Sequence, residues 1–231
     1  MNGKLSTAAV IIISVFAVAI DLILFGGIHY NVVLGIIAAA GILPYLTSHG
    51  NRRAVSYELR IIIMLTIISA LDIYFCSSLS FIRPLTTVTI AAGIFFGAPA
   101  GYICGVFSVL VVSVLSGTGG WTVFQVCLMG IIGFFAGVLS RKARESNIFL
   151  SVLTLISAFA FSCTGVLSPI WSADKGFNLQ SYPSVLRHSV KWFIVYAVSD
   201  IIVILILKKL LSRKAERIKK RFRIFEYNPK K

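Results

Sequence analysis

The sequence predicts an all-α protein that crosses a membrane several times. Of its 231 residues, 58% are hydrophobic and 13% are charged, and the mean hydropathy is +0.92. The apolar residues gather in runs of about 20, which is the length that a helix needs to cross a bilayer core of about 30 Å. The runs are continuous, whereas the strands of an outer-membrane barrel show alternating polarity. We therefore expect a polytopic helical membrane protein without a large soluble domain.

Eight membrane helices are expected along the chain. They are predicted at residues 5–25, 31–46 and 58–77, at three short helices within 84–137, and at 148–167 and 189–207. The first run has no convincing small-residue cleavage site, so it is expected to be a retained helix and not a signal peptide. Six crossings is the alternative count if the first pair does not span.

Basic residues predict the orientation of the chain. Eighteen of the 22 Lys and Arg residues lie at Lys4, in two basic loops around residues 48–60 and 141–146, or in the tail after residue 207. Because cytoplasmic loops carry the excess of Lys and Arg, both termini are expected in the cytoplasm. The same distribution explains the net charge of +14 without a nucleic-acid partner, and the tail is expected on the anionic cytoplasmic leaflet.

Residues 84–137 contain no charged residue and are expected to organise the core. Two glycine-rich turns, at residues 97–101 and 116–122, separate three short apolar helices. Glycines recur at four-residue spacing, which lets helix backbones approach closely in a membrane. These glycines are Gly93, Gly97, Gly101 and Gly105, and then Gly133 and Gly137.

No catalytic or metal-binding motif occurs in the sequence. It lacks a P-loop, an HExxH or GxSxG motif and a carboxylate cluster, so an enzyme is not expected. The cysteines do not have metal-ligand spacing and are expected to pack as small apolar residues. They are Cys76, Cys104, Cys127 and Cys163.

The second glycine-rich turn is the first candidate binding site. Its glycines leave backbone N–H groups at the start of the next helix free to meet a ligand. Trp121 offers a flat stacking surface, and Gln125 lies one helical turn further on the same face. An interfacial tryptophan beside an ordinary turn explains the same residues, and the two interpretations have similar weight.

Other polar residues are weaker candidates. Asp72 is expected near the outer surface, hydrated or paired with Arg83, and Asp200 lies deeper, near the middle of the last helix, where burial requires a partner or water. His188 lies on the outer side of Asp200. The long loop at residues 168–188 contains stacking and hydrogen-bonding side chains that suit a lid over a pocket or a solvated connector.

A family resemblance rests on residues 65–139. Pro84 and Thr86 precede the glycine-spaced apolar run, and the second turn supplies Gly117, Gly119, Trp121, Thr122 and Gln125, followed by Gly130, Gly133 and Gly137. This stretch resembles the membrane-embedded substrate-binding (S) components of energy-coupling factor (ECF) vitamin transporters, most closely the cobalamin-type branch. Gly120 and Val126 stand where that branch often has Pro and Met, which leaves the vitamin open.

The resemblance implies a six-helix substrate-binding core at residues 51–211, preceded by a transmembrane pair at 1–50 and followed by a basic cytoplasmic tail at 212–231. It implies a bacterial cytoplasmic membrane protein that captures a vitamin outside, with cobalamin as the first guess. The implied partners are a transmembrane coupling (T) protein, contacted through Thr66 and Ala70, and two ATPases, with no covalent cofactor. The substrate site implied is Arg83, Thr86, Gly119, Trp121, Thr122, Gln125, Trp171, Asn178 and Tyr182.

Two other functions are compatible with the sequence. A non-catalytic membrane scaffold would use the glycine spacing for packing alone and the basic tail to recruit a partner. A lipid enzyme would need Asp72 or Asp200 to act without a second acid, a metal cluster or a histidine, which makes it the weakest of the three.

Overall fold

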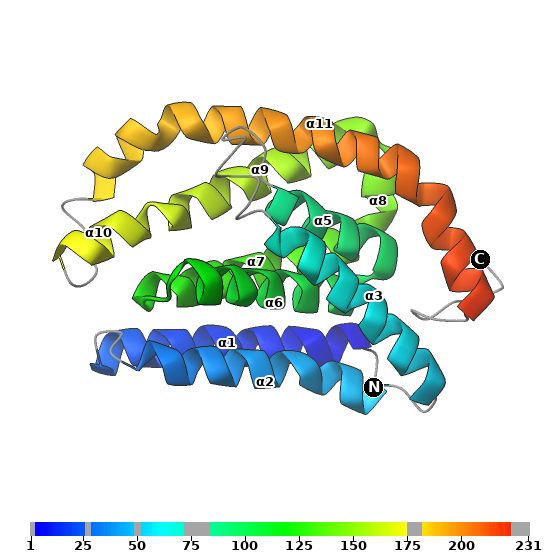
Figure 1. Cartoon of the computed structure of the whole chain (residues 1–231), viewed down its shortest axis with the longest axis horizontal. Helices are drawn as coiled ribbons and strands as arrows, with labels where there is room; N and C mark the ends of the chain where they lie inside the picture. The colour runs from blue at the N-terminus through cyan, green and yellow to red at the C-terminus, as the bar shows by residue number, and fades with distance from the viewer. Residues whose placement is uncertain (1–2, 26–28, 49–51, 72–83, 175–181, 223–231) are drawn as a thin grey trace.

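The computed structural model describes residues 3–25, 29–48, 52–71, 84–174 and 182–222, and every regular element in these ranges is an α-helix (Figure 1). The helical class is therefore confirmed for the described residues. The helices are α1 (Gly3–Phe25), α2 (Tyr30–Ser48), α3 (Arg52–Ala70), α5 (Pro84–Phe96), α6 (Ala98–Ser116), α7 (Gly120–Val138), α8 (Ser140–Glu145), α9 (Asn147–Gly165), α10 (Leu167–Asp174) and α11 (Tyr182–Phe222).

The helices form a bundle with two distinct ends. The link between α6 and α7, residues 117–119, marks one end, called here the turn end; α10 and the start of α11 lie on the same side in Figure 1. The short helix α8 marks the opposite end, called here the basic end, and the start of α3 lies on that side. The antiparallel pair α1 and α2 forms a separate layer against α6 and α7, while α9 and α11 cover the other side.

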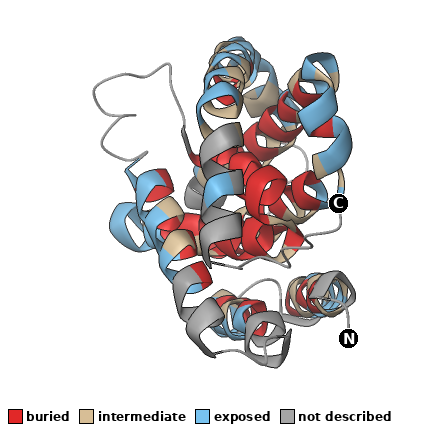
Figure 2. Cartoon of the chain, turned by 90° about the vertical axis from the view of Figure 1, so that its right-hand side faces the viewer, coloured by how far each residue is buried: buried red, intermediate tan, exposed pale blue. Residues whose placement is uncertain are grey.

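Helix α5 is the centre of the bundle. All residues from Leu85 to Phe96 are buried, and α5 contacts α3, α6, α7, α8, α9 and α11. Figure 2 shows the buried residues concentrated in the middle of the bundle, with exposed residues on the outward faces. A helix buried on all sides is expected to be apolar all round. The threonines near its start, Thr86, Thr87 and Thr89, are therefore the unusual feature of α5.

Glycines hold α5, α6 and α7 in backbone contact. A Cβ atom at Gly93 or at Gly101 would collide with the carbonyl oxygen of Gly133, and one at Gly105 would collide with that of Met129. A Cβ at Gly137 would likewise collide with the backbone at the start of α6. The packing role predicted for the glycine spacing is confirmed for these residues, because a side chain does not fit at these approaches. Gly97 is the exception, since a Cβ atom there would have no close neighbour.

Four described helices are long and apolar enough to cross a membrane. They comprise Ala98–Ser116, Gly120–Val138, Asn147–Ile170 and Tyr182–Ser212, and three shorter apolar helices cover Ser6–Leu22, Tyr30–Ile42 and Leu85–Phe96. Large apolar side chains point outward, with Phe16 at 65% and Val114 at 74% exposure. A soluble protein rarely exposes contiguous apolar patches larger than a few hundred Å². These faces fit a lipid environment, and the chain is a helical membrane protein.

The first glycine-rich turn and the second basic loop differ from the sequence-based expectations. The turn is a single residue, Gly97 at φ 103°, because residues 98–101 form the first turn of α6, where Pro99 is tolerated. Residues 140–145, expected in a loop, form α8. The stretch SRKARE consists mainly of good helix formers, which accounts for this helix.

The expected long loop at residues 168–188 is also largely helical. Its first part forms α10, and α11 begins at Tyr182. Pro169 and Pro183 both fall in the first turn of a helix, where a missing N–H costs nothing. Helix α11 then continues for 41 residues, so the basic tail extends the last membrane helix without a break as far as Phe222.

Tyr102 joins the N-terminal pair to the core. Its hydroxyl lies 3.2 Å from that of Ser14 on α1, and its ring passes Gly41 on α2 and Gly130 on α7. Tyr102 is only 1% exposed. The pair is therefore fixed to α6 near the basic end, where α6 begins.

Candidate functional site

The turn between α6 and α7 is closed by its own backbone and by Thr122. The N–H of Gly117, at φ 106°, donates to the Ser113 carbonyl over 2.8 Å. The Gly119 N–H donates to the Thr122 hydroxyl over 3.1 Å, and the Thr122 N–H donates to the Gly119 carbonyl over 2.9 Å. Both Gly119 and Thr122 are buried. These predicted site residues shape the start of α7 and do not present free polar groups.

Trp121 lies directly against Gly119. A Cβ atom at Gly119 would collide with the six-membered ring of Trp121. The backbone at Gly119 is extended, with φ −160°, so the glycine is required by the ring and not by the backbone conformation. Trp121 and Gln125 are both half-buried. Among the predicted residues of the turn, these two side chains remain accessible for stacking and hydrogen bonding.

Thr87 and Asp200 form a polar pair inside the bundle. The Thr87 hydroxyl donates to Oδ1 of Asp200 over 3.0 Å, joining α5 to α11. Thr87 is 0% exposed and Asp200 is 2% exposed. An ionisable group inside a membrane helix is costly, and such residues usually mark substrate or ion sites. The predicted need of Asp200 for a partner is confirmed.

The predicted residues of α5 and of the turn lie at different depths. The methyl group of Thr89 meets Gly105 and Gly133, which sets the level of α5 against α7. Thr86 is three residues before Thr89, and Gln125 is eight before Gly133. Both helices run from the turn end toward the basic end (Figure 1), so Thr86 lies deeper in the bundle than Gln125. Thr86 is buried, so the two residues belong to separate levels of the bundle.

The remaining predicted substrate residues are placed only in part. Arg83 and Asn178 lie outside the described residues, as does Asp72. Trp171 belongs to α10. Tyr182 is the first residue of α11, and its hydroxyl donates to the Cys163 carbonyl at the end of α9 over 3.1 Å, so it fastens α11 to α9.

A pocket between α9 and α11 was not predicted from the sequence. It has a volume of about 200 Å³ and lies near the turn end of the bundle. Hydroxyl and aromatic side chains line it, among them Ser162, Ser189, Trp192, Phe193 and Tyr196. The Trp192 and Tyr196 rings are stacked with centroids 6.3 Å apart. Their spacing of four residues on a helix was the signal available in the sequence.

Thr66 and Ala70, the residues implied to contact a coupling protein, face into the bundle. Thr66 is 7% and Ala70 is 8% exposed. The hydroxyls of Thr66, Ser69 and Thr89 gather around the Cys104 thiol, whose sulfur also lies 3.8 Å from Ser108 Oγ. The outward face of α3 carries large apolar side chains, including Met64 and Ile67.

The cysteines are free thiols where the structure describes them. Cys104 is buried, and Cys127 and Cys163 are half-buried. Cys76 falls outside the described ranges. The expectation that cysteines pack as apolar residues is confirmed for these three. No group of three potential metal ligands occurs within the described residues.

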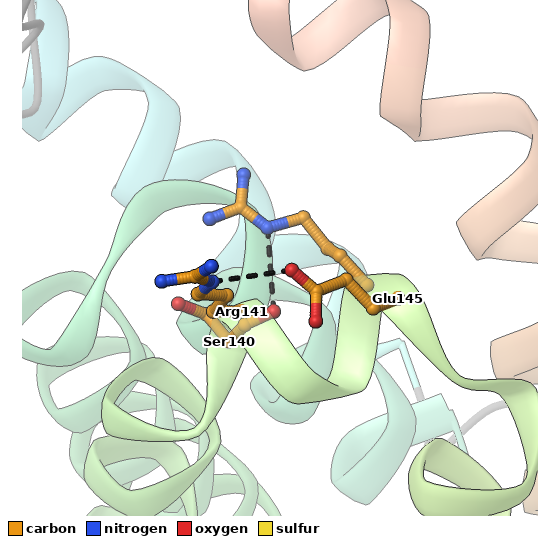
Figure 3. Close-up of polar contacts among 4 residues, drawn as sticks. Ser140, Arg141 and Glu145 are labelled. Atoms are coloured by element: carbon orange, nitrogen blue, oxygen red, sulfur yellow. Dashed lines mark hydrogen bonds and ion pairs between the residues drawn. The ribbon is translucent and has the colours of Figure 1, made fainter. Parts of the chain in front are cut away.

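Lys208 organises the basic end. Its ammonium group donates to the Ala143 carbonyl over 3.1 Å and to Oδ1 of Asn147 over 2.7 Å. Figure 3 shows the neighbouring α8, where Arg141 Nε donates to Glu145 Oε1 over 3.2 Å and Arg144 Nε donates to the Ser140 carbonyl over 3.3 Å. Both arginines are exposed. Helix α8 and the basic part of α11 therefore meet at one surface.

Comparisons of the chain with family models, with curated proteins and with solved structures found no match.

Proposed function

We propose that this chain is the membrane-embedded substrate-binding component of an ECF-type transporter, which captures a vitamin or related micronutrient outside the cell. The substrate would pass inward with the help of a transmembrane coupling protein and two ATPases. Cobalamin is the first ligand to test, because the resemblance of residues 65–139 is closest to that branch. The membrane concerned would be the bacterial cytoplasmic membrane, with the turn end outside and both termini inside.

The observation that carries the proposal is the buried pair of Thr87 and Asp200. A carboxylate 2% exposed inside an apolar helix costs several kcal/mol unless its environment compensates. Helix packing alone does not require a carboxylate here, since the main core cluster is apolar and the other buried polar side chains of α5, Thr86 and Thr89, are uncharged. Binding of a polar ligand would explain why a carboxylate is placed at this buried position.

Two groups of residues at different depths in the bundle would contact the substrate. Trp121 and Gln125 at the turn end offer a half-exposed ring and an amide, suited to the first contact with a flat polar ligand. The Thr87–Asp200 pair lies deeper and would hold a polar group of the bound substrate. The close packing of α5, α6 and α7 would hold Thr87 at a fixed position relative to Trp121 and Gln125. Glycine contacts between the backbones of these helices would limit their movement against one another.

The test is ligand retention by the purified full-length protein. Membranes are incubated with a mixture of vitamins and precursors, the protein is purified, and retained molecules are identified by mass spectrometry. Wild type is compared with Trp121→Ala, with Asp200→Asn and with Phe135→Ala, a lipid-facing control on α7 that is 51% exposed. We expect one vitamin in the wild type and control, with less in the two site variants. Wild-type protein without any retained vitamin or precursor would oppose the proposal.

A scaffold role is the second candidate, favoured by the unbroken helix that joins the last membrane span to the basic tail. It predicts that truncation after Ser212 abolishes function and that function does not depend on binding a small molecule. Truncated protein that still retains the vitamin would support transport over the scaffold role.

A further inference from the structure

A groove lies between helices α2 and α6 on the side of the turn end. Near the basic end they are held together where the Tyr102 ring passes Gly41. Toward the turn end, between residues 31–38 of α2 and residues 107–118 of α6 and the turn after it, the groove has a volume of about 490 Å³. The groove lies between the N-terminal pair and the core, and it is distinct from the Thr87–Asp200 pair and from the α9–α11 pocket.

The walls of the groove are apolar, and its polar residues are at one end. Leu34, Phe107, Val111 and Val114 form much of the lining, and no charged residue contributes. Asn31 and Thr118, both exposed, lie at the turn end. An apolar trough with hydrogen-bonding groups only at its mouth matches the polarity of an amphiphile.

Small residues of α2 give the groove its depth. Gly35 and Ala38 both line it, and a Cβ atom at Gly35 would have no neighbour within 4 Å. The glycines between α5, α6 and α7 contact other backbones, whereas Gly35 borders open space. Gly35 therefore has no packing role in the described structure, and its lack of a side chain serves to leave room.

The dimensions of the groove fit one leaflet of a bilayer. From Phe107 to Thr118 the α6 wall spans eleven residue steps, about 16 Å along the helix. This is about half of a hydrocarbon core of about 30 Å. A helix of about 10 Å diameter and this length would occupy more than about 1,200 Å³, so the groove is too small to enclose a helix.

We propose that the α2–α6 groove binds one hydrocarbon chain of a membrane lipid, with the lipid head group at Asn31 and Thr118. The chain lies along the apolar walls, and the uncharged mouth holds the head group by hydrogen bonds. The N-terminal pair thus forms a lipid site together with the core, in addition to any substrate site.

The test uses a phosphatidylcholine that carries a photoreactive diazirine in the middle of one acyl chain. The full-length protein is reconstituted into vesicles containing this lipid, irradiated and digested, and labelled peptides are mapped by mass spectrometry. Ala38→Leu and Gly35→Leu fill the groove from α2. Ala39→Leu adds the same side chain to a neighbouring exposed position outside the groove and serves as the matched control. Thermal unfolding verifies that each variant is folded.

We expect the label on the α6 wall between Phe107 and Thr118, and we expect it to be lost in the two groove variants and kept in Ala39→Leu. Asn31→Leu with Thr118→Val should weaken lipid retention about fivefold or more, as the loss of a hydrogen bond predicts. Equal labelling of the α6 wall in folded groove variants and control would overturn the proposal, since it would indicate ordinary surrounding lipid. A label confined to other outward faces would overturn it as well.

Discussion

The Thr87 hydroxyl donates a hydrogen bond to Oδ1 of Asp200 over 3.0 Å, and so links the central helix to the last helix across 113 residues of sequence. Both side chains are almost completely buried. This hydrogen bond places the Asp200 carboxylate beside α5, in a bundle whose contacts are mostly apolar.

Removal of the Thr87 hydroxyl should destabilise the protein. Thr87→Val keeps the side-chain shape but leaves a buried carboxyl oxygen without this donor, which should cost about 1–3 kcal/mol. Asp200→Asn keeps an acceptor at the same place and should cost less. Thermal unfolding in detergent measures both changes. In a double-mutant cycle of Thr87→Val with Asp200→Leu, which removes the acceptor, the two changes should not be additive, and simple additivity would show that the pair does not interact.

Gly133 should tolerate no side chain. A Cβ atom there would collide with the Gly101 carbonyl, and backbone cannot rotate away as a side chain can. We expect Gly133→Ala to cost at least about 1–3 kcal/mol, the range for an overpacked core. Gly35→Ala is the control, because a Cβ there has open space and alanine favours helix by about 0.5–1 kcal/mol. Unfolding temperatures that fall equally in the two variants would disprove the packing role.

Gly119→Ala should move the Trp121 ring. The added methyl group meets the ring, and the ring is the group that can give way. The measurement is tryptophan emission in a protein whose other two tryptophans, Trp171 and Trp192, are replaced by phenylalanine. We expect a shifted emission maximum, and Gly117→Ala provides the comparison because its strain is in the backbone at φ 106°. An unchanged spectrum for Gly119→Ala would show that the ring does not rest on the turn.

Lys208 should stabilise the basic end, whereas its neighbour Lys209 should not. Lys208 donates to Ala143 and Asn147, and Lys209 is exposed. Lys208→Ala should lower stability by about 1 kcal/mol, the usual value for such a contact. Lys209→Ala removes the same charge without these hydrogen bonds and should have little effect. Equal loss in both variants would point to net charge and not to the junction between α8 and α11.

Apolar periodicity and glycine spacing predicted much of the bundle. Four long apolar helices among the described residues, the link at Gly117 and the close packing at Gly93 and Gly133 follow from local sequence. The ends of helices were predicted less well. Residues 140–145 and 167–174 look like loops because they are polar or contain proline, yet their helix propensity and first-turn proline positions make them helical.

The sequence predicted only those parts of the candidate site whose residues are close together in the chain. Trp121 and Gln125 lie on one face of α7 because they are four residues apart. The contact between Thr87 and Asp200 depends on how distant helices pack, which a single sequence does not encode in any short pattern. Thr122 was expected to face substrate, but its hydroxyl accepts from the Gly119 N–H. Capping the start of α7 uses the same residue types as binding a ligand, so the sequence does not separate the two roles.

The most direct test of the proposed function is equilibrium binding of a vitamin panel to the purified full-length protein, measured by titration calorimetry. We predict that one vitamin or vitamin precursor binds saturably, with a dissociation constant in the nanomolar to micromolar range, and that Trp121→Ala weakens this binding while Phe135→Ala does not. A folded protein that binds no member of the panel would contradict it.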